Sequence, residues 1–296
     1  MKIAVTYDNG EIFQHLSMEK LHIEKGSVQE TLIIPLYGRK LCAEHFPALY
    51  QDEYAARICD SIDYDFSQFK DKEKSAMYQF GALEGAMREK DMLWEITDYL
   101  KEHPNAAVVN LGCGLNMTGR TADNGTCRIY NLDFPDVIKS RNELVPAGDR
   151  EENIACDLND FSWMDQIDAS EGAVLYAAGV FHYFTTQQIK DMVIAMADRF
   201  PGGRLVFDAV GKFGRDKLMK CTLKGMGMND VSGLFYVNDA SGLEGWSPKV
   251  TLKTKKSYMQ GYYKLDDPNI KGIHRFLAKL CDSLAKMYIY RMEFAG

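Results

Sequence analysis

The sequence lacks several features that would indicate particular classes of protein. Its seven cysteines are scattered at positions 42, 59, 113, 127, 156, 221 and 281, and none belongs to a C-x-x-C pair. An odd number of cysteines without regular spacing argues against a disulfide framework and against a structural zinc site. We therefore expect reduced thiols, no bound metal and a cytoplasmic protein.

Long apolar runs and an excess of positive charge are lacking too. No apolar segment approaches the length of a membrane span, and the N-terminus has no signal-peptide core. The formal net charge of −7 leaves no surplus of Lys and Arg to neutralise the phosphates of a nucleic acid. The basic run KTKK at 253–256 is short and fits a solvated edge strand. Membrane and nucleic-acid partners are not expected.

What the chain does contain is an alternation of strand-like and helical patterns. Hydrophobic residues make up 46% of it, which is enough to bury a large core. Strand–helix alternation predicts a mostly parallel sheet covered on both faces, that is, an α/β, Rossmann-like doubly wound fold. The expected seven strands are 107–111, 128–132, 152–156, 173–178 and 204–209, then an antiparallel edge pair at 249–258 and 286–294.

The segments before this alternation predict separate parts. Residues 1–17 alternate like a strand and contain the turn signal Asp8-Asn9-Gly10. They resemble the opening of dinitrogenase iron–molybdenum cofactor-binding proteins, but the rest of that fold is missing. Helices are expected near 47–60 and over 71–102. The predicted division is an added hairpin arm (1–17), an N-terminal helical cap (18–70) and a main domain (71–296) with a substrate-side insertion (211–248).

The first strand of the predicted sheet ends in a glycine turn, within AAVVNLGCGLN (106–116). Gly112 and Gly114 therefore lie at the carboxyl end of a strand, where ligands bind in an open parallel sheet. Glycine lets the backbone turn sharply and approach a ligand without a Cβ in the way. By itself the pattern is a weak indication, because an ordinary strand-to-helix turn looks the same.

Acidic residues follow the next two predicted strands. Asp133 lies nineteen residues after Gly114, a spacing at which a carboxylate can bind ribose hydroxyls. Asp157 and Leu158 end the third strand, where a carboxylate and an amide can bind adenine. Either aspartate could instead cap a helix or a turn. Met117 breaks the dinucleotide pattern G-x-G-x-x-G, so S-adenosylmethionine, which has no phosphate, fits better than NAD.

Several longer segments together resemble the leucine carboxyl methyltransferase family, in particular its bacterial branch of polyketide O-methyltransferases. The resemblance runs from about residue 27 to the end of the chain. The matching segments are ETLIIPLYGRK (30–40), the helix carrying Arg88, VVNLGCGLN (108–116), YNLDFPDVI (130–138), LYAAGVFHYF (175–184), FPGGRLVFD (200–208) and LEGWSPKVTL (243–252).

The resemblance implies a class I S-adenosylmethionine-dependent methyltransferase and assigns roles to its residues. Arg88 is implied to hold the methionyl carboxylate, which a guanidinium can bind through two parallel hydrogen bonds. The family usually has Glu where this chain has Ala178, so the methionyl ammonium is short of one acidic partner; the backbone carbonyls of Gly112 and Ala177 could replace it. The expected cofactor-binding residues are Arg88, Asn110, Gly112, Cys113, Gly114, Asp133, Phe134, Asp157, Leu158, Ala177 and Ala178.

The acceptor side is defined by fewer residues. A carboxylate acceptor is already ionised at neutral pH and needs no general base. A phenol or alcohol would need one, and His182 or Tyr183 could act in catalysis there, although His182 could equally be a packed loop histidine. Tyr37, Arg39 and Trp246 are candidate substrate-binding residues, with structural anchoring and core packing as the alternatives.

Together these patterns predict an S-adenosylmethionine-dependent O-methyltransferase that acts on a carboxylate or hydroxyl of a small molecule. Two alternatives stay open at this point. A non-catalytic module that binds the cofactor would be consistent with Ala178, and a nicotinamide-dependent oxidoreductase would use the same glycine turn.

Overall fold

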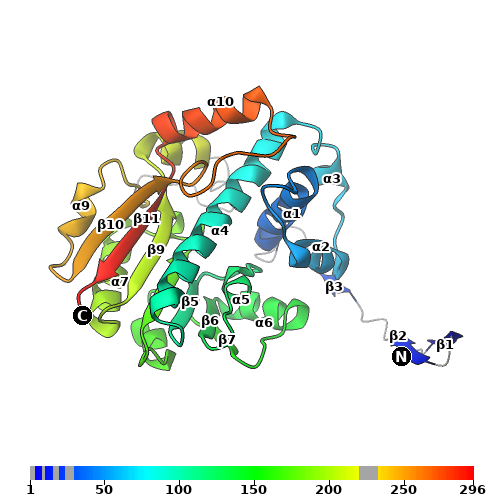
Figure 1. Cartoon of the computed structure of the whole chain (residues 1–296), viewed down its shortest axis with the longest axis horizontal. Coiled ribbons are helices and arrows are strands. Elements are labelled where there is room, and N and C mark those ends of the chain that lie inside the picture. The colour runs from blue at the N-terminus through cyan, green and yellow to red at the C-terminus, as the bar shows by residue number, and fades with distance from the viewer. Residues whose placement is uncertain (1–3, 9–10, 16–19, 24–29, 220–232) are drawn as a thin grey trace.

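The computed structural model describes residues 4–8, 11–15, 20–23, 30–219 and 233–296 (Figure 1). Its centre is a seven-stranded sheet made of β5 (Ala107–Leu111), β6 (Arg128–Asp133), β7 (Glu151–Ala155), β8 (Ala173–Ala177), β9 (Arg204–Ala209), β10 (Val250–Ser257) and β11 (Tyr288–Phe294). The strand order is β10-β11-β9-β8-β5-β6-β7.

The pairing of these strands confirms the predicted fold class. Strands β9, β8, β5, β6 and β7 are parallel, and β11 pairs antiparallel with both β9 and β10. The two neighbours of β5 are β6 and β8, so the strand order reverses direction at β5. In doubly wound sheets, a crevice for ligands forms at such a reversal, outside the carboxyl ends of the strands.

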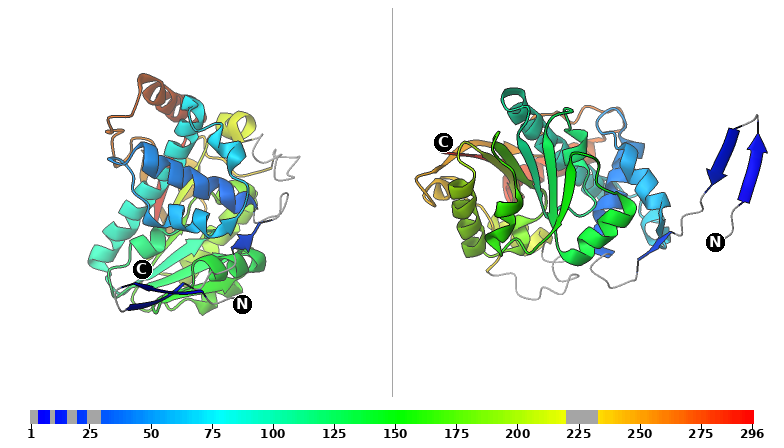
Figure 2. Two further views of the ribbon diagram at one scale, coloured as in Figure 1. Left: turned by 90° about the vertical axis from the view of Figure 1, so that its right-hand side faces the viewer. Right: turned by 90° about the horizontal axis from the view of Figure 1, so that it is seen from below.

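Helices cover both faces of the sheet (Figure 2). On one face, Val108, Val174 and Val206 are buried with side chains of α4 (Ala76–Glu102) and α10 (Gly272–Leu280). On the other, the alternate residues Val109 and Leu175 are buried with side chains of α7 (Thr186–Arg199) and η1 (Phe161–Gln166). Because both faces are buried, the strands are nearly continuous apolar runs, and this explains why the sequence located them well.

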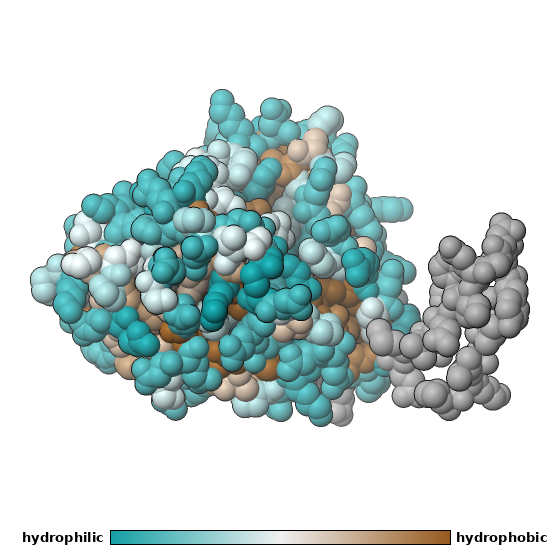
Figure 3. All heavy atoms as spheres, turned by 60° about the horizontal axis from the view of Figure 1, so that its bottom comes forward, coloured by the Kyte–Doolittle hydropathy of each residue, from teal (hydrophilic) through white to brown (hydrophobic). Residues whose placement is uncertain are grey.

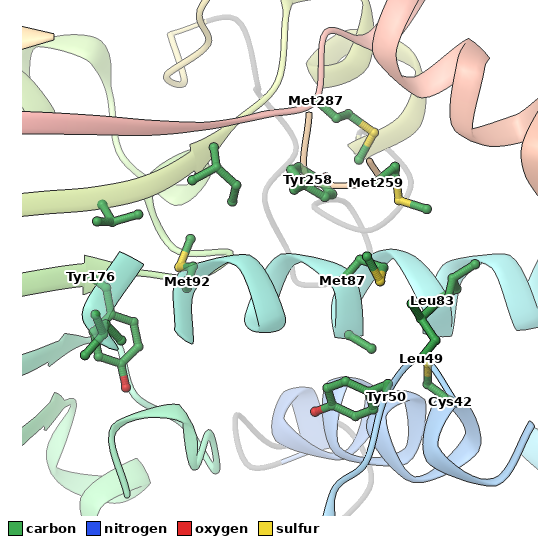
Figure 4. Close-up of a cluster of buried hydrophobic side chains, with 14 of the residues drawn as sticks. Cys42, Leu49, Tyr50, Leu83, Met87, Met92, Tyr176, Tyr258, Met259 and Met287 are labelled. Carbon is green, nitrogen blue, oxygen red and sulfur yellow. The ribbon is translucent and has the colours of Figure 1, made fainter. Parts of the chain in front are cut away.

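Helix α4 joins the N-terminal cap to the sheet. Its first half packs along α1 (Glu30–His45), and its second half contacts β8, β9 and β11. Figure 4 shows Leu83 and Met87 of α4 between Cys42 and Tyr50 of the cap on one side and Tyr258 on the other. This one helix therefore shares its apolar surface between the cap and the main domain.

The cap contains α1, α2 (Glu53–Asp60) and the short α3 (Ser67–Lys70). Helix α2 begins later than the predicted 47–60, because the Asp52 side chain accepts hydrogen bonds from the amides of Tyr54 and Ala55 and so sets its start. Similarly, α4 begins at Ala76 rather than at 71, after a series of turns. Strand β3 (Leu21–His22) pairs in parallel with β4 (Ile62–Asp63).

The N-terminal segment contains β1 (Ala4–Asp8) paired antiparallel with β2 (Glu11–His15), as expected of a hairpin; the Asn9-Gly10 turn lies outside the described residues. Part of the 211–248 insertion also lies outside the described residues, and its described ends hold η3 (Gly214–Met219) and α9 (Ser241–Glu244).

Hydrophilic side chains cover most of the surface seen in Figure 3, with hydrophobic ones showing between them near its middle. Within the described ranges, no helix is both long enough and apolar enough to span a bilayer.

Candidate cofactor site

The glycine turn after β5 has a backbone that side chains would not tolerate. Gly112 and Gly114 have φ of +66° and +47°, in the left-handed region. A Cβ on Gly112 would lie 2.7 Å from Cγ2 of Val180, and one on Gly114 would lie 3.3 Å from Cδ2 of Leu32. The turn is therefore enclosed by the loop after β8 on one side and by helix α1 of the cap on the other.

Asp133, at the end of β6, lies against this turn. One carboxylate oxygen accepts a hydrogen bond from the Gly114 amide at 2.8 Å, and the other accepts one from the Phe134 amide at 2.8 Å. Burial raises the pKa of Asp133, and these two amides oppose that effect. The Phe134 side chain beside it is 52% exposed. The structure thus brings an oriented carboxylate and an exposed ring next to the glycine turn.

The end of β7 lies beside the end of β6. The Cys156 amide donates to the Asp133 carbonyl at 2.9 Å. The exposed Asp157 carboxylate accepts a hydrogen bond from the Asn159 amide at 2.9 Å, which is the turn-capping contact that the sequence left open. Leu158 is buried. The roles of Asp157 and Leu158 toward adenine stay predictions, because a capped turn is compatible with a bound ring.

Three asparagines on neighbouring strands form a row of hydrogen bonds, called here the asparagine ladder, which the sequence did not reveal. The Asn110 amide donates to Asn131 at 3.5 Å, and Asn131 donates to Asn153 at 3.1 Å, across β5, β6 and β7. From α6 (Pro135–Leu144), the buried Arg141 donates to the Gly114 carbonyl at 2.9 Å and to Asn153 at 3.2 Å. Nδ2 of the buried Asn110 thus has a partner within the sheet, and the cofactor role of Asn110 stays a prediction.

Arg88 meets a second carboxylate, Asp208, which the sequence analysis missed. Nη1 of Arg88 lies 3.4 Å from Oδ2 of Asp208, and the Gly179 amide donates to Oδ1 at 2.5 Å. Gly179 has a φ of +72°, and a Cβ there would lie 2.7 Å from Arg88 Nη1. Nε of Arg88 is buried and has no hydrogen-bond partner among the described residues. Like Asp133, Asp208 is a carboxylate near the end of an apolar strand, and that signal could have found it.

Further ionisable side chains surround this pair. His182, in η2 (Phe181–Tyr183), is 8% exposed, and burial is the main reason why its pKa falls to about 4. Burial likewise raises the pKa of Tyr183. One turn before Arg88 on α4, Glu84 accepts a hydrogen bond from Tyr258 at 3.2 Å, and burial raises the pKa of Glu84 to about 6. Because its pKa is about 4, His182 is neutral at pH 7.

The predicted substrate residues in the cap make anchoring contacts. The buried Arg39 donates to the Leu115 carbonyl at 2.8 Å and pairs with Asp52 and Glu89 at 3.4 and 3.6 Å. The Tyr37 hydroxyl donates to Glu73.

Trp246 packs against Phe235, with ring centroids 6.1 Å apart. Substrate roles for Tyr37, Arg39 and Trp246 stay predictions, and the contacts present hold the cap and the core together.

The residues present fit S-adenosylmethionine better than a dinucleotide. Nε of Arg88 is a buried donor without a partner among the described residues, as a site for the methionyl carboxylate requires, and the Asp133 carboxylate lies against the glycine turn, where a ribose would bind. The helix that follows the turn, α5 (Thr118–Thr121), is a single turn, so it offers little of the dipole that holds a pyrophosphate. In the described part of the chain, no group of His, Cys, Asp or Glu is arranged to hold a metal ion.

Comparison with known proteins decides the family. A sequence model of leucine carboxyl methyltransferases matches residues 38–197, which is more than half of the chain. The chain belongs to the leucine carboxyl methyltransferase family. As a member of this family it is an S-adenosylmethionine-dependent methyltransferase, and S-adenosylmethionine is its cofactor.

This member of the leucine carboxyl methyltransferase family is similar in sequence to two proteins with assigned names. The tetracenomycin polyketide synthesis O-methyltransferase TcmP of Streptomyces glaucescens is 28% identical over 184 residues, which cover 62% of this chain and 66%, just under two thirds, of that relative. The S-adenosyl-L-methionine-dependent methyltransferase dpfgK of Gibberella zeae is 24% identical over 284 residues, covering 88% of this chain and 93% of that one.

Solved structures show the same fold. A methyltransferase candidate from Thermobifida fusca YX superposes with a TM-score of 0.57 at 15% identity, covering 94% of this chain and 96% of the other. A DUF574 family protein from Streptomyces avermitilis gives 0.53 at 13% identity, covering 86% and 100%. At these identities the likeness concerns the fold of the family member and not its substrate.

Proposed function

We propose that this methyltransferase transfers the methyl group to an oxygen, in a carboxylate or hydroxyl of a small molecule. The methyl-donor side of this proposal is supported by contacts at the ends of neighbouring strands, and the acceptor side by a named relative. Asp133 of β6 binds the glycine turn of β5, and Asp208 of β9 binds the turn after β8 and Arg88. The relative TcmP is named as an O-methyltransferase of polyketide synthesis, which agrees with an oxygen acceptor in a small molecule.

Each of these residues has a part in holding the cofactor. Asp133 would accept hydrogen bonds from the ribose hydroxyls, and the exposed Phe134 ring would cover one side of the adenine. Asp157 and Leu158 would contact the adenine edge, and Arg88 the methionyl carboxylate. When bound, S-adenosylmethionine supplies a methyl group on a positively charged sulfur. The chain orients the acceptor and keeps water away.

The buried groups near Arg88 favour an acceptor that ionises easily. With a pKa of about 4, His182 is a weak base, and Glu84 has a pKa of about 6. Neither group is strong enough to remove the proton from an aliphatic alcohol. A carboxylate needs no base, and an acidic phenol needs only a weak one. We therefore place carboxylates and acidic phenols first among the acceptors.

The division of the chain is part of the same proposal. The cap (18–70) and the insertion (211–248) shape the acceptor side, and the main domain from 71 onward holds the cofactor. The position of α1 beside Gly114 supports this, because a cap helix there covers the turn.

Methyl transfer to a panel of acceptors tests the proposal. The protein would be incubated with S-adenosylmethionine carrying a tritiated methyl group and with aromatic carboxylic acids, phenols, alcohols and amines. Mild base then separates products, because it releases methanol from methyl esters but leaves methyl ethers and methylamines intact. We expect transfer to carboxylates or phenols. Transfer to amines alone would contradict an oxygen acceptor, and tight cofactor binding without any transfer would indicate a binding module.

A further inference from the structure

The methionyl end of S-adenosylmethionine carries a carboxylate and an ammonium group, so its site needs both a cation and an anion. Arg88 supplies the cation. Position 178, in the loop that follows β8, offers only the methyl group of an alanine. Backbone carbonyls can accept from an ammonium, but a charged acceptor forms a hydrogen bond roughly twice as strong.

The sheet register places a carboxylate beside this position. Strands β8 and β9 are parallel, and Ala177 lies opposite Phe207. Ala178 and Asp208 follow this last pair, and the Gly179 amide donates to Oδ1 of Asp208 at 2.5 Å, so Asp208 reaches the loop that carries position 178. We propose that Asp208 is the acidic partner of the methionyl ammonium group, supplying from β9 the charge that position 178 lacks. This inference rests on the proposed cofactor site.

The contacts of Asp208 leave room for this role. Its side chain is 4% exposed and accepts hydrogen bonds from the Gly179 amide at 2.5 Å and from Arg88 at 3.4 Å. An ionised carboxylate has about four lone-pair positions, so two more remain for donors such as an ammonium. Arg88 and Asp208 then present one cation and one anion side by side, which complements a zwitterion.

A contribution to folding stability alone does not explain the pair of Arg88 and Asp208. Removing two charges from water is costly, and apolar residues of similar volume often stabilise a core as well or better. The 3.4 Å separation of Arg88 and Asp208 is longer than that of a strong charge-assisted bond, and Arg88 Nε lacks a partner among the described residues. A pair that is only partly satisfied until a zwitterion binds accounts for both observations.

Binding of three ligands distinguishes this role from structural support of the Gly179 turn. The ligands are S-adenosylhomocysteine, its analogue in which hydrogen replaces the α-amino group, and 5′-methylthioadenosine, which lacks the amino-acid end. We expect wild type to bind S-adenosylhomocysteine at least about tenfold more tightly than the deamino analogue by isothermal titration. In Asp208→Asn this preference should vanish, while the affinities for the other two ligands change less than about twofold.

The matched control is Asp98→Asn. Asp98 lies on α4, the same helix as Arg88, but it pairs with Arg204 at 3.1 Å, and no hydrogen bond or ion pair joins it to Arg88 or Asp208 in the described part of the chain. The control variant should keep the wild-type preference. Equal weakening of all three ligands in Asp208→Asn, or a preference that survives the substitution, would overturn the inference in favour of structural support. If circular dichroism shows that this variant does not fold, the wild-type comparison still tests the inference, since binding without any preference for the amino group would overturn it. Binding of none of the ligands would instead reject the cofactor site itself.

Discussion

At the scale of single residues, the site depends on backbone positions that only glycine can occupy without strain. Gly112 and Gly179 both have positive φ. A Cβ added at either position would lie within 3 Å of a neighbouring side chain, that of Val180 or of Arg88. These two turns follow adjacent strands of the sheet, β5 and β8. Substitutions at either turn should therefore disturb the proposed cofactor site.

Gly112→Ala should lower the free energy of unfolding by at least about 2 kcal/mol, because it adds left-handed strain to a clash with Val180. Urea unfolding measures this. Gly81→Ala in α4 is the matched control, since its Cβ would meet nothing within 4 Å; it should raise stability by about 0.5–1 kcal/mol through helix propensity. Equal effects of the two substitutions would show that the turn at Gly112 is not constrained.

Asp91 provides a prediction about pH. This carboxyl is fully buried in α4, and burial, with a contribution from nearby Glu95, raises the pKa of Asp91 to about 8. The folded state keeps a proton that the unfolded chain releases near pH 4, so this group costs stability increasingly as pH rises from about 4 to 8. Asp91→Asn removes that cost.

The gain of the Asp91→Asn variant over wild type should therefore be smallest near pH 4.5 and grow by about 1 kcal/mol per pH unit up to about pH 8. Urea unfolding at intervals between these pH values measures the gain. Asp98→Asn, which removes a partly exposed and ion-paired carboxylate from the same helix, should show no gain that grows with pH. A constant difference between Asp91→Asn and wild type would mean that Asp91 is ionised throughout.

At the scale of elements, contacts between neighbouring segments hold the strand ends in place. Helix α6 reaches back to the β5 turn through Arg141, and α1 lies beside Gly114. The sequence predicted the strands well because strands buried on both faces are apolar runs bounded by polar turns. It located helix starts less well, because the start of α2 depends on Asp52 and its side-chain hydrogen bonds.

Arg141→Met tests the contact between α6 and the glycine turn. It leaves the Gly114 carbonyl and the asparagine ladder without their buried donor, so we expect stability to fall by about 3 kcal/mol and affinity for S-adenosylhomocysteine to fall about tenfold. The control is Arg128→Met, which removes an exposed pair with Asp168 and should cost less than about 1 kcal/mol without changing affinity. Thermal unfolding and titration measure both, and unchanged affinity in Arg141→Met would show that the ladder does not shape the site.

At the scale of the whole molecule, the order of strands in the sheet determines which residues meet. Local patterns were enough to select Gly112, Gly114 and Asp133, because each follows a recognisable strand. The same local signal also marks Asp208, near the end of β9, but its partners depend on the pairing of β9 with β8 and on the approach of Arg88 from α4. These are contacts between segments far apart in the sequence, and spacing along the chain does not encode them.

The central claim is that these strand ends hold one adenosine-containing cofactor without a pyrophosphate. Isothermal titration of the wild-type protein with S-adenosylhomocysteine and, separately, with NAD tests it most directly. We expect one molecule of S-adenosylhomocysteine to bind per chain, no detectable binding of NAD, and a loss of at least about tenfold in affinity in Asp133→Ala. Binding of NAD without S-adenosylhomocysteine, or unchanged affinity in Asp133→Ala, would contradict the account.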